Sequence, residues 1–451
     1  MTLGLSIFGI VLAFICLIVL TYKGLHIAWV SVLAALIIIV TSGLALGETW
    51  TATIGDGIGH MAGTLIPMFL AGATLGKLFT LTGAADSFAK FIIKALTSRL
   101  SPPRKRTVAA YIIALIAILM MMAGIDNFAV LFTLIAITSS LMNEVGIPRR
   151  FMGALIMVGL LVAGMIPGNP SVINIFAMEY LDGVSAVTGA NLAIPGALFI
   201  LVVSIWGMSR MWEKDVAAGE VFEYGNLAKA SFDEKDLPPW FLLLIPTGVT
   251  FVCFNIIQLP VFFALLAGLV CAVIVLCPWI PYNKEDSKNI VIGKIRAISD
   301  TFNGGAELAG VPCVILINMA LGNVIGASPA LEWLTTSLGN YSGSINSYII
   351  FAIIAVFVIG VTASMSGLIV LYNMAATLFV PAFGISAIAA HRIIAFSSTV
   401  LDSLPFGTMV VTILLITGTK QKDGYPPIFF STVGVSAVAT VLVTILSMIL
   451  Y

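Results

Sequence analysis

Four short stretches of small and polar residues interrupt long apolar runs in this chain of 451 residues. Their sequences are GIDN at 124–127, PGNPS at 167–171, TASMSG at 362–367 and DSLPFGT at 402–408. Because proline removes a backbone N–H group and glycine loosens a helix, each stretch predicts a helix break. In an apolar environment the freed backbone groups must find partners in protein, water or a ligand. We therefore expect the four breaks to meet around a hydrated cavity.

Such a cavity has the chemistry of an anion site. Apolar helices follow the breaks, and N–H groups at a helix N-terminus carry a partial positive charge that attracts anions. Arginine and lysine are absent from the breaks, so amide and hydroxyl groups would have to bind a carboxylate, weakly and reversibly. The candidate substrate-binding residues are Asn127, Gly168, Asn169, Ser171, Ser364, Ser366, Ser403 and Thr408.

Two acidic residues, Asp126 and Asp402, lie within the breaks. A carboxylate at mid-depth in a membrane is costly when it is charged and unpaired. Each aspartate could therefore take up a proton together with the substrate, or contribute to a sodium site with backbone carbonyl groups. Alternatively, each could only cap the half-helix that follows it. These roles can coexist.

The composition predicts a membrane protein that crosses the bilayer many times. Hydrophobic residues make up 60% of the chain, charged residues make up 9%, and the mean hydropathy is +1.12. About a quarter of the residues in a soluble domain are charged. The formal net charge is zero, and no basic domain is present to bind nucleic acid. The five cysteines form no CxxC pair and are interpreted as packing residues. We expect neither a metal site nor an organic cofactor.

Two apolar runs, 107–142 and 347–383, are too long for one span of about 20 residues. Basic residues flank the first run on both sides, which places both flanks in the cytoplasm. Two short spans would also satisfy this rule. Arms of roughly 17 and 15 residues are marginal for two spans, however, so we favour re-entrant hairpins.

With two hairpins, about ten transmembrane helices remain and both termini lie outside the cytoplasmic (inner) membrane. Among the 21 basic residues, Arg392 alone is then external. It could close an outer gate together with His391, but exposure of both residues at the surface is the expected arrangement.

The chain divides into two weakly similar halves, 1–211 and 240–451, joined by a charged cytoplasmic linker at 212–239. Gly-Ile follows each long run, at 146–147 and at 384–385, and a proline comes at the same spacing beyond each pair. The broken helices are expected at 151–178 and 387–417. The predicted fold is therefore all-α, with two inverted-topology repeats whose helices are interrupted at mid-membrane, as in secondary transporters.

Several motifs resemble the gluconate permease family of proton symporters for organic acids. They are PMFLAGATLGKLFTLTGAAD from Pro67, IPGNPSVIN from Ile166 and HRIIAFSSTVLDSLPFGTMVVTILLITGTKQKDGYPPIF from His391. The resemblance implies membership of the wider ion transporter superfamily, with inverted repeats, paired re-entrant hairpins, a homodimer and elevator-type movement. It adds functional weight to 167–174 and 402–408.

The chain departs from the family pattern at Phe406-Gly407, where the family has His-Asn. A donor is replaced by a hydrophobic side chain, which favours a short hydroxy monocarboxylate, such as lactate or 3-hydroxybutyrate, over a polyhydroxylated sugar acid. The predicted function is proton-coupled carboxylate symport, with sodium as the alternative coupling ion. The rival functions are an anion channel and a membrane enzyme, either an intramembrane protease or an ion-pumping decarboxylase subunit. The HExxH and GxGD motifs of membrane proteases are absent.

Overall fold

The computed structural model is helical, and none of the residues that it describes lies in a β-strand. The structure describes residues 3–451 except 24, 26, 85–86, 89, 92–99, 126, 225–236, 282–288, 307–315, 318–320, 322, 340–344, 363–365 and 406–407. Asp126 and Ser364, two of the predicted site residues, lie outside the described residues. For Ser366 and Thr408 the backbone is described but the side chain is not.

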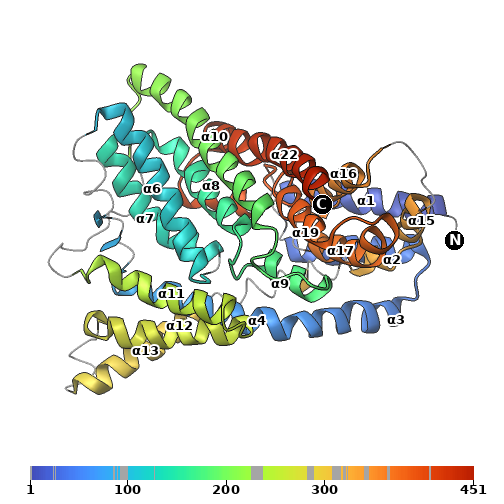
Figure 1. The fold of residues 1–451 in the computed structure, drawn as a ribbon, viewed down its shortest axis with the longest axis horizontal. Coiled ribbons are helices and arrows are strands. Elements are labelled where there is room, and N and C mark those ends of the chain that lie inside the picture. The colour runs from blue at the N-terminus through green and yellow to red at the C-terminus, as the bar shows by residue number, and fades with distance from the viewer. Residues whose placement is uncertain are drawn as a thin grey trace.

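Figure 1 shows the described helices of the first half. They are α1 (Leu3–Tyr22), α2 (Ile27–Ser42), α3 (Leu46–Glu48), α4 (Asp56–Leu81), α6 (Pro102–Met122), α7 (Asn127–Val145), α8 (Met152–Met165), α9 (Val172–Tyr180) and α10 (Ala190–Ala217).

The second half repeats part of this order, because a close helix pair is again followed by an interrupted helix. Its helices are α11 (Leu244–Asn255), α12 (Val261–Leu276), α13 (Ile290–Ala306), α15 (Pro329–Gly339), α16 (Ser347–Thr362), α17 (Ser366–Met374), α18 (Val380–Phe383), α19 (Ala387–Ser397), α20 (Thr408–Ile416), α21 (Gln421–Ile428) and α22 (Val435–Leu450). The pairs are α6–α7 and α16–α17, and the interrupted helices are α8–α9 and α19–α20.

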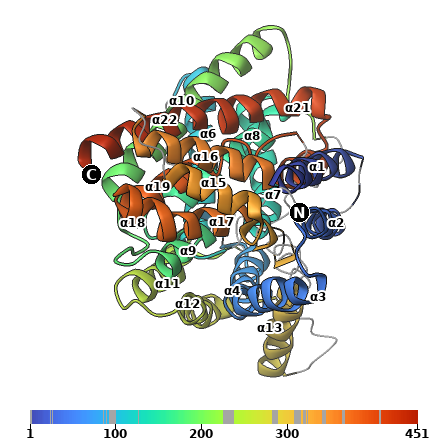
Figure 2. The ribbon, with the colours of Figure 1, turned by 90° about the vertical axis from the view of Figure 1, so that its right-hand side faces the viewer.

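Both halves contribute to one large hydrophobic core, which includes side chains of α6, α8, α10, α16, α19 and α22. Figures 1 and 2 show these helices together, with α4, α11, α12 and α13 along one side of them, and side chains of α4, α11 and α12 belong to the same core. A second, smaller cluster joins α1 and α2 to residues 321–325. The interrupted helix α8–α9 therefore lies within the main body, where tertiary contacts can hold its broken backbone.

The turn between α6 and α7 falls at the predicted break. Gly124 has a φ of +82°, a conformation that suits glycine. Its N–H donates to the carbonyl of Met121 at 2.8 Å, and the Ile125 N–H donates to the carbonyl of Met120 at 3.2 Å. These two bonds form a Schellman motif, which satisfies the last carbonyl groups of α6. The glycine of GIDN thus ends one helix and lets the chain turn into the next.

The two arms of this pair are longer than the sequence pattern predicted. The α6 helix has 21 residues and α7 has 19, so they extend about 31 and 28 Å at 1.5 Å per residue. Each therefore approaches the thickness of a bilayer core, about 30 Å. Four segments of the described chain are long and apolar enough to cross a membrane: Pro102–Met122, Ala190–Ala217, Val261–Trp279 and Gln421–Leu450. Arm length alone therefore no longer favours a hairpin over two spans.

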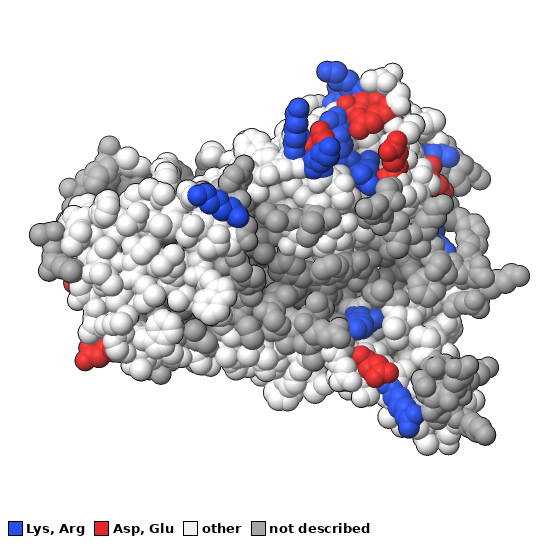
Figure 3. Space-filling model, turned by 180° about the vertical axis from the view of Figure 1, so that it is seen from behind, with Lys and Arg blue, Asp and Glu red and all other residues white. Residues whose placement is uncertain are grey.

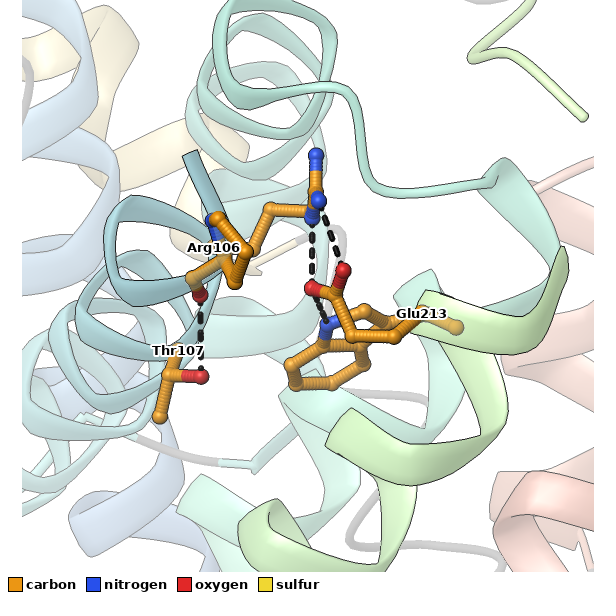
Figure 4. A network of polar contacts seen from close by, with 5 residues as sticks. Arg106, Thr107 and Glu213 are labelled. Atoms are coloured by element: carbon orange, nitrogen blue, oxygen red, sulfur yellow. Dashed lines mark hydrogen bonds and ion pairs between the residues drawn. The ribbon is translucent and has the colours of Figure 1, made fainter. Parts of the chain in front are cut away.

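Ion pairs fix both outer ends of the α6–α7 pair to the same end of α10. Arg106, in the first turns of α6, donates two hydrogen bonds to Glu213, with N–O distances of 2.7 and 2.6 Å (Figure 4). Arg150, just beyond α7, pairs with Asp215. Charged side chains on the face drawn in Figure 3 also gather mainly toward one end of the molecule. The two flanks of the pair therefore lie on one side of the protein.

Candidate functional site

The loop between α8 and α9 interrupts a helix at the PGNPS sequence. The α8 helix ends at Met165, and α9 begins after Ser171, whose extended backbone lies at the N-cap position. Gly168 has a φ of +82°, and its N–H donates to the carbonyl of Ala186 at 2.9 Å. The loop of residues 166–171 therefore separates α8 from α9, and the N-terminus of α9 begins within the protein.

In the first half the two breaks contact each other, and in the second half the described residues next to the two breaks do so. A Cβ atom built on Gly124 would lie 3.4 Å from Cγ of Pro170, which places the α6–α7 turn against loop 166–171. A Cβ built on Gly360, near the end of α16, would lie 2.6 Å from Cβ of Leu401, in the turn between α19 and α20. The α17 helix also reaches across to α9, because the Tyr372 hydroxyl contacts the carbonyl of Ile173 at 2.9 Å.

Two predicted binding residues carry buried oxygen atoms that have no hydrogen-bond partner among the described residues. They are Asn127, whose Oδ1 lies at the start of α7, and Ser171, whose Oγ lies at the start of α9. The Ser171 hydroxyl makes no capping bond with the N–H groups of α9. Because a buried polar atom without a partner is costly, these two atoms are suited to meet a ligand or water.

The other described candidates have different surroundings. Asn169 is 1% exposed, and its Nδ2 donates to the carbonyl of Ala163 at 2.5 Å, so this donor is engaged within the protein. Ser403 is buried, and its carbonyl accepts a hydrogen bond from the Tyr425 hydroxyl at 3.3 Å. Asp402 lies in the turn after α19, where its side chain is accessible. Of these three residues, Asn169 has a structural contact, because its amide binds a carbonyl group near the end of α8.

Asn255, at the end of α11, is a neighbour of the loop that sequence reasoning did not identify. Its Nδ2 donates to the carbonyl of Gly168 at 2.9 Å and to the carbonyl of Phe251 at 3.2 Å. These two acceptors fix the orientation of the amide, and Oδ1 is left buried without a described partner. Helix α11, from the second half, thus adds a third buried oxygen atom without a described partner, and this atom lies next to Gly168.

The expectation that His391 and Arg392 lie at the surface was wrong, because both are 0% exposed. His391 Nε2 lies 3.1 Å from Oδ1 of Asn174, and its Nδ1 lies 2.9 Å from the Tyr372 hydroxyl. Asn174 in turn donates from Nδ2 to the carbonyl of Asn169 at 2.7 Å, so its Oδ1 is the acceptor. The Tyr372 hydroxyl has a single proton, which it donates either to the carbonyl of Ile173 or to Nδ1 of His391, and the tautomer of His391 depends on this choice.

These contacts connect the two halves close to loop 166–171. Tyr372 comes from α17, His391 from α19 and Asn174 from α9. Their positions in the sequence are far apart, and only packing brings them together. Arg392 was nevertheless marked in the sequence, since it was the single exception to the charge pattern that set the topology.

Comparison with known proteins gives matches of three kinds: to a family model, to a curated relative and to solved structures. A model of the GntP family of permeases matches residues 5–274. The uncharacterized transporter YxjC of Bacillus subtilis (strain 168) is 22% identical over 437 residues, covering 85% of this chain and 86% of the relative. The crystal structure of the Alcanivorax borkumensis YdaH transporter, which has an unusual topology, matches with a TM-score of 0.53 at 14% identity, covering 88% of this chain and 87% of that one. The last match is a likeness of fold.

Proposed function

The chain belongs to the GntP family of permeases and is a membrane transporter of that type, and we propose that it is a symporter for small organic carboxylates. Its preferred cargo is a short hydroxy monocarboxylate, which it moves across the cytoplasmic membrane together with protons. Sodium is the alternative coupling ion. The motifs from Pro67, Ile166 and His391 had predicted this family; the family match ends before the third of them.

The start of α9 carries this proposal. Its N-terminal N–H groups bring a partial positive charge to loop 166–171, and the Ser171 hydroxyl beside them is buried without a described partner. The α6–α7 turn lies against the same loop and brings Asn127 into the neighbourhood. A carboxylate placed here would accept hydrogen bonds from the backbone of α9 and from Ser171.

A hydroxy acid would suit the remaining atoms of this region. The unpartnered Oδ1 atoms of Asn127 and Asn255 are acceptors, and a carboxylate has no proton to offer them. A hydroxyl group on the cargo is a donor and can bond to one of them. Phe406, in place of the family's histidine, leaves fewer donors for further hydroxyl groups.

We further propose that the α6–α7 and α16–α17 pairs are re-entrant hairpins within two inverted repeats. Supporting this, the α6–α7 turn is covered by protein: Ile125 is 2% exposed, and Gly124 packs against Leu265. Non-helical backbone at membrane depth is stable only in such surroundings or beside water. Elevator-type movement and a homodimer, which the sequence resemblance implies, complete the proposal together with proton uptake by Asp402 and Asp126, which rests on the place of these two acids in the breaks.

Transport by the purified protein in proteoliposomes tests this function. Uptake of labelled lactate and 3-hydroxybutyrate is measured with an imposed pH gradient, then with a sodium gradient, and finally with neither. A symporter accumulates its cargo above the external concentration under one of the gradients. Equilibration without accumulation would instead indicate a channel. Absence of carboxylate uptake, with gluconate also included in the panel, would contradict the proposed cargo class.

A further inference from the structure

Arg392 places a positive charge inside the protein behind loop 166–171. The side chain is 0% exposed, and none of the ion pairs between described residues includes it. A guanidinium keeps its proton in proteins, so the charge persists here. A buried charge without an opposite charge is unfavourable unless other groups compensate for it. The surroundings of Arg392 must therefore supply negative potential.

Backbone carbonyl groups provide most of that compensation. Nε of Arg392 donates to the carbonyl of Thr188 at 2.9 Å, and one terminal nitrogen, Nη2, donates to the carbonyls of Thr188 and Ala186, the latter at 3.1 Å. The stem is also confined, since a Cβ on Gly189 would lie 2.9 Å from Cγ of Arg392. These contacts hold the guanidinium in one place against the segment that follows α9.

The other terminal nitrogen, Nη1, faces the break itself. Its contacts are the carbonyl of Met165 at 3.5 Å and Oδ1 of Asn174 at 3.4 Å, both long for hydrogen bonds. Met165 is the last residue of α8, and Asn174 lies in the first turn of α9. The two contacts therefore bracket loop 166–171. Ala186, which binds Nη2, also binds the N–H of Gly168 within that loop.

Arg392 provides a fixed positive charge, which the residues of the four breaks lack in the sequence. Carbonyl dipoles compensate for Arg392 only partly, and electrostatic interactions extend further in a low-dielectric interior than in water. Its potential at loop 166–171 adds to that of the α9 N-terminus. An arginine that served only to join α19 to the 186–189 segment would need its donors there, but not its charge.

We propose that Arg392 is a specificity-determining residue, which makes the site at loop 166–171 selective for anions by acting on the bound carboxylate through space. It acts from behind the loop and makes no contact with the cargo. This inference rests on the proposed function, because it assumes an anionic cargo bound at the start of α9.

The test compares each carboxylate with its neutral amide in binding to the purified full-length protein. The probes are lactate, 3-hydroxybutyrate, lactamide and 3-hydroxybutyramide, with Kd measured by calorimetry. Arg392→Gln should weaken carboxylate binding by about tenfold or more and leave amide binding within about threefold, because only the charged cargo responds to the potential. Arg392→Lys should keep most of the selectivity. Arg210→Gln, an exposed arginine on α10, is the matched control and should bind like the wild type.

A second variant covers the case in which Arg392→Gln does not fold. Asn174→Asp places a negative charge next to Nη1 and should lower the carboxylate-to-amide affinity ratio in the same direction. Equal losses for carboxylate and amide in these variants would assign Arg392 a positioning role and overturn the inference alone. An unchanged ratio would also overturn it. Failure of the wild type to bind any carboxylate would instead overturn the proposed function, and this inference with it.

Discussion

Ser171 and Asn127 carry buried oxygen atoms that the described part of the chain leaves without partners, beside the first two breaks. Elsewhere in the bundle, hydroxyl groups usually bond to the preceding turn of their own helix, as Thr74 and Thr440 do. A polar side chain in an apolar run is therefore weak support for a site. The combination of burial, a missing partner and a helix N-terminus is much more specific.

We expect Ser171→Ala to weaken carboxylate binding roughly 10- to 150-fold, because a hydrogen bond to a charged group contributes about 1.5–3 kcal/mol. The fold should be retained, since the Ser171 hydroxyl makes no described bond within the protein. Ser209→Ala is the control, because that hydroxyl only bonds to the carbonyl of Trp206 on α10. The measurement is Kd in detergent, and wild-type affinity in the Ser171 variant would remove this residue from the site.

Gly168→Ala should impair transport, whereas Gly164→Ala should not. At Gly168 the φ of +82° disfavours a side chain, and the new Cβ would lie 3.0 Å from both Oδ1 of Asn255 and Cε2 of Phe251. Strain of this kind costs about 1–3 kcal/mol. Gly164 lies in α8, shortly before the loop, and a Cβ built on it would meet open space. Uptake and thermal unfolding should separate the two variants, and equal behaviour would show that the loop adapts.

At the scale of elements, the α6–α7 pair and α10 are held together by charge at one end and by packing along their length. Arg106 is about nine-tenths buried and forms two bonds with Glu213, which also accepts a bond from Nε1 of Trp212 at 3.2 Å. Removing Arg106 leaves the Glu213 carboxylate, whose side chain is 32% exposed, without its ionic partner. The pair therefore anchors the start of α6.

Arg106→Gln should lower the free energy of unfolding by about 1.5–3 kcal/mol, the size of a hydrogen bond to a charged group. Arg104→Gln, two residues earlier and exposed, should have an effect within about 0.5 kcal/mol. Thermal or denaturant unfolding in detergent measures both. If the two variants have equal stability, the Arg106–Glu213 pair does not anchor the helix.

Single cysteines at Ser101 and Asn143, in a chain with its five native cysteines replaced, should both resist an impermeant thiol reagent added from outside. Both positions are exposed: Ser101 directly precedes α6, and Asn143 lies in the last turn of α7. The ends of this pair are fixed to the same end of α10. A permeant reagent should label both, which shows that they are reactive. Labelling of one position but not the other from outside would contradict the shared cytoplasmic location.

At the scale of the whole molecule, the symport that we propose requires the two halves to respond together to the cargo and to the coupling ion. Tyr372, His391 and Asn174 connect α17 and α19 with α9 by buried hydrogen bonds. A change at the second-half breaks can therefore reach loop 166–171 through a continuous set of contacts. The coupling residue that we propose, Asp402, lies in the turn directly after α19.

Asp402→Asn should abolish gradient-driven accumulation and leave substrate exchange partly intact. Exchange needs only the loaded carrier to move, whereas net accumulation also needs the ion to be bound and released. Asn keeps the size and the hydrogen bonding of the side chain, but its amide has no negative charge and cannot take up the coupling proton. Asp423→Asn, at the start of α21, serves as the control. Uptake and counterflow in proteoliposomes are measured, and wild-type accumulation by the Asp402 variant under both gradients would exclude it as the coupling residue.

The sequence by itself determined the properties that depend on local chemistry. Composition alone established a membrane protein, and the motifs predicted the family to which the chain belongs. Helices end or begin at GIDN, at PGNPS and around DSLPFGT because glycine and proline change the backbone within a few residues of themselves. The lengths of both helices were underestimated, because hydropathy did not show that the basic residues 104–106 belong to α6 and that the polar residues Asn143 and Glu144 belong to α7.

Only the tertiary structure decided which distant residues surround the breaks. Arg392 was expected at the surface because the charge rule treats each basic residue as exposed to one aqueous side. In the folded chain its acceptors come from Met165, Asn174, Ala186 and Thr188, more than 200 positions away in the sequence. The place of Asn255 beside Gly168 has the same origin. No local pattern encodes such neighbours, because packing between helices brings the carbonyl groups that make a buried guanidinium stable into one place.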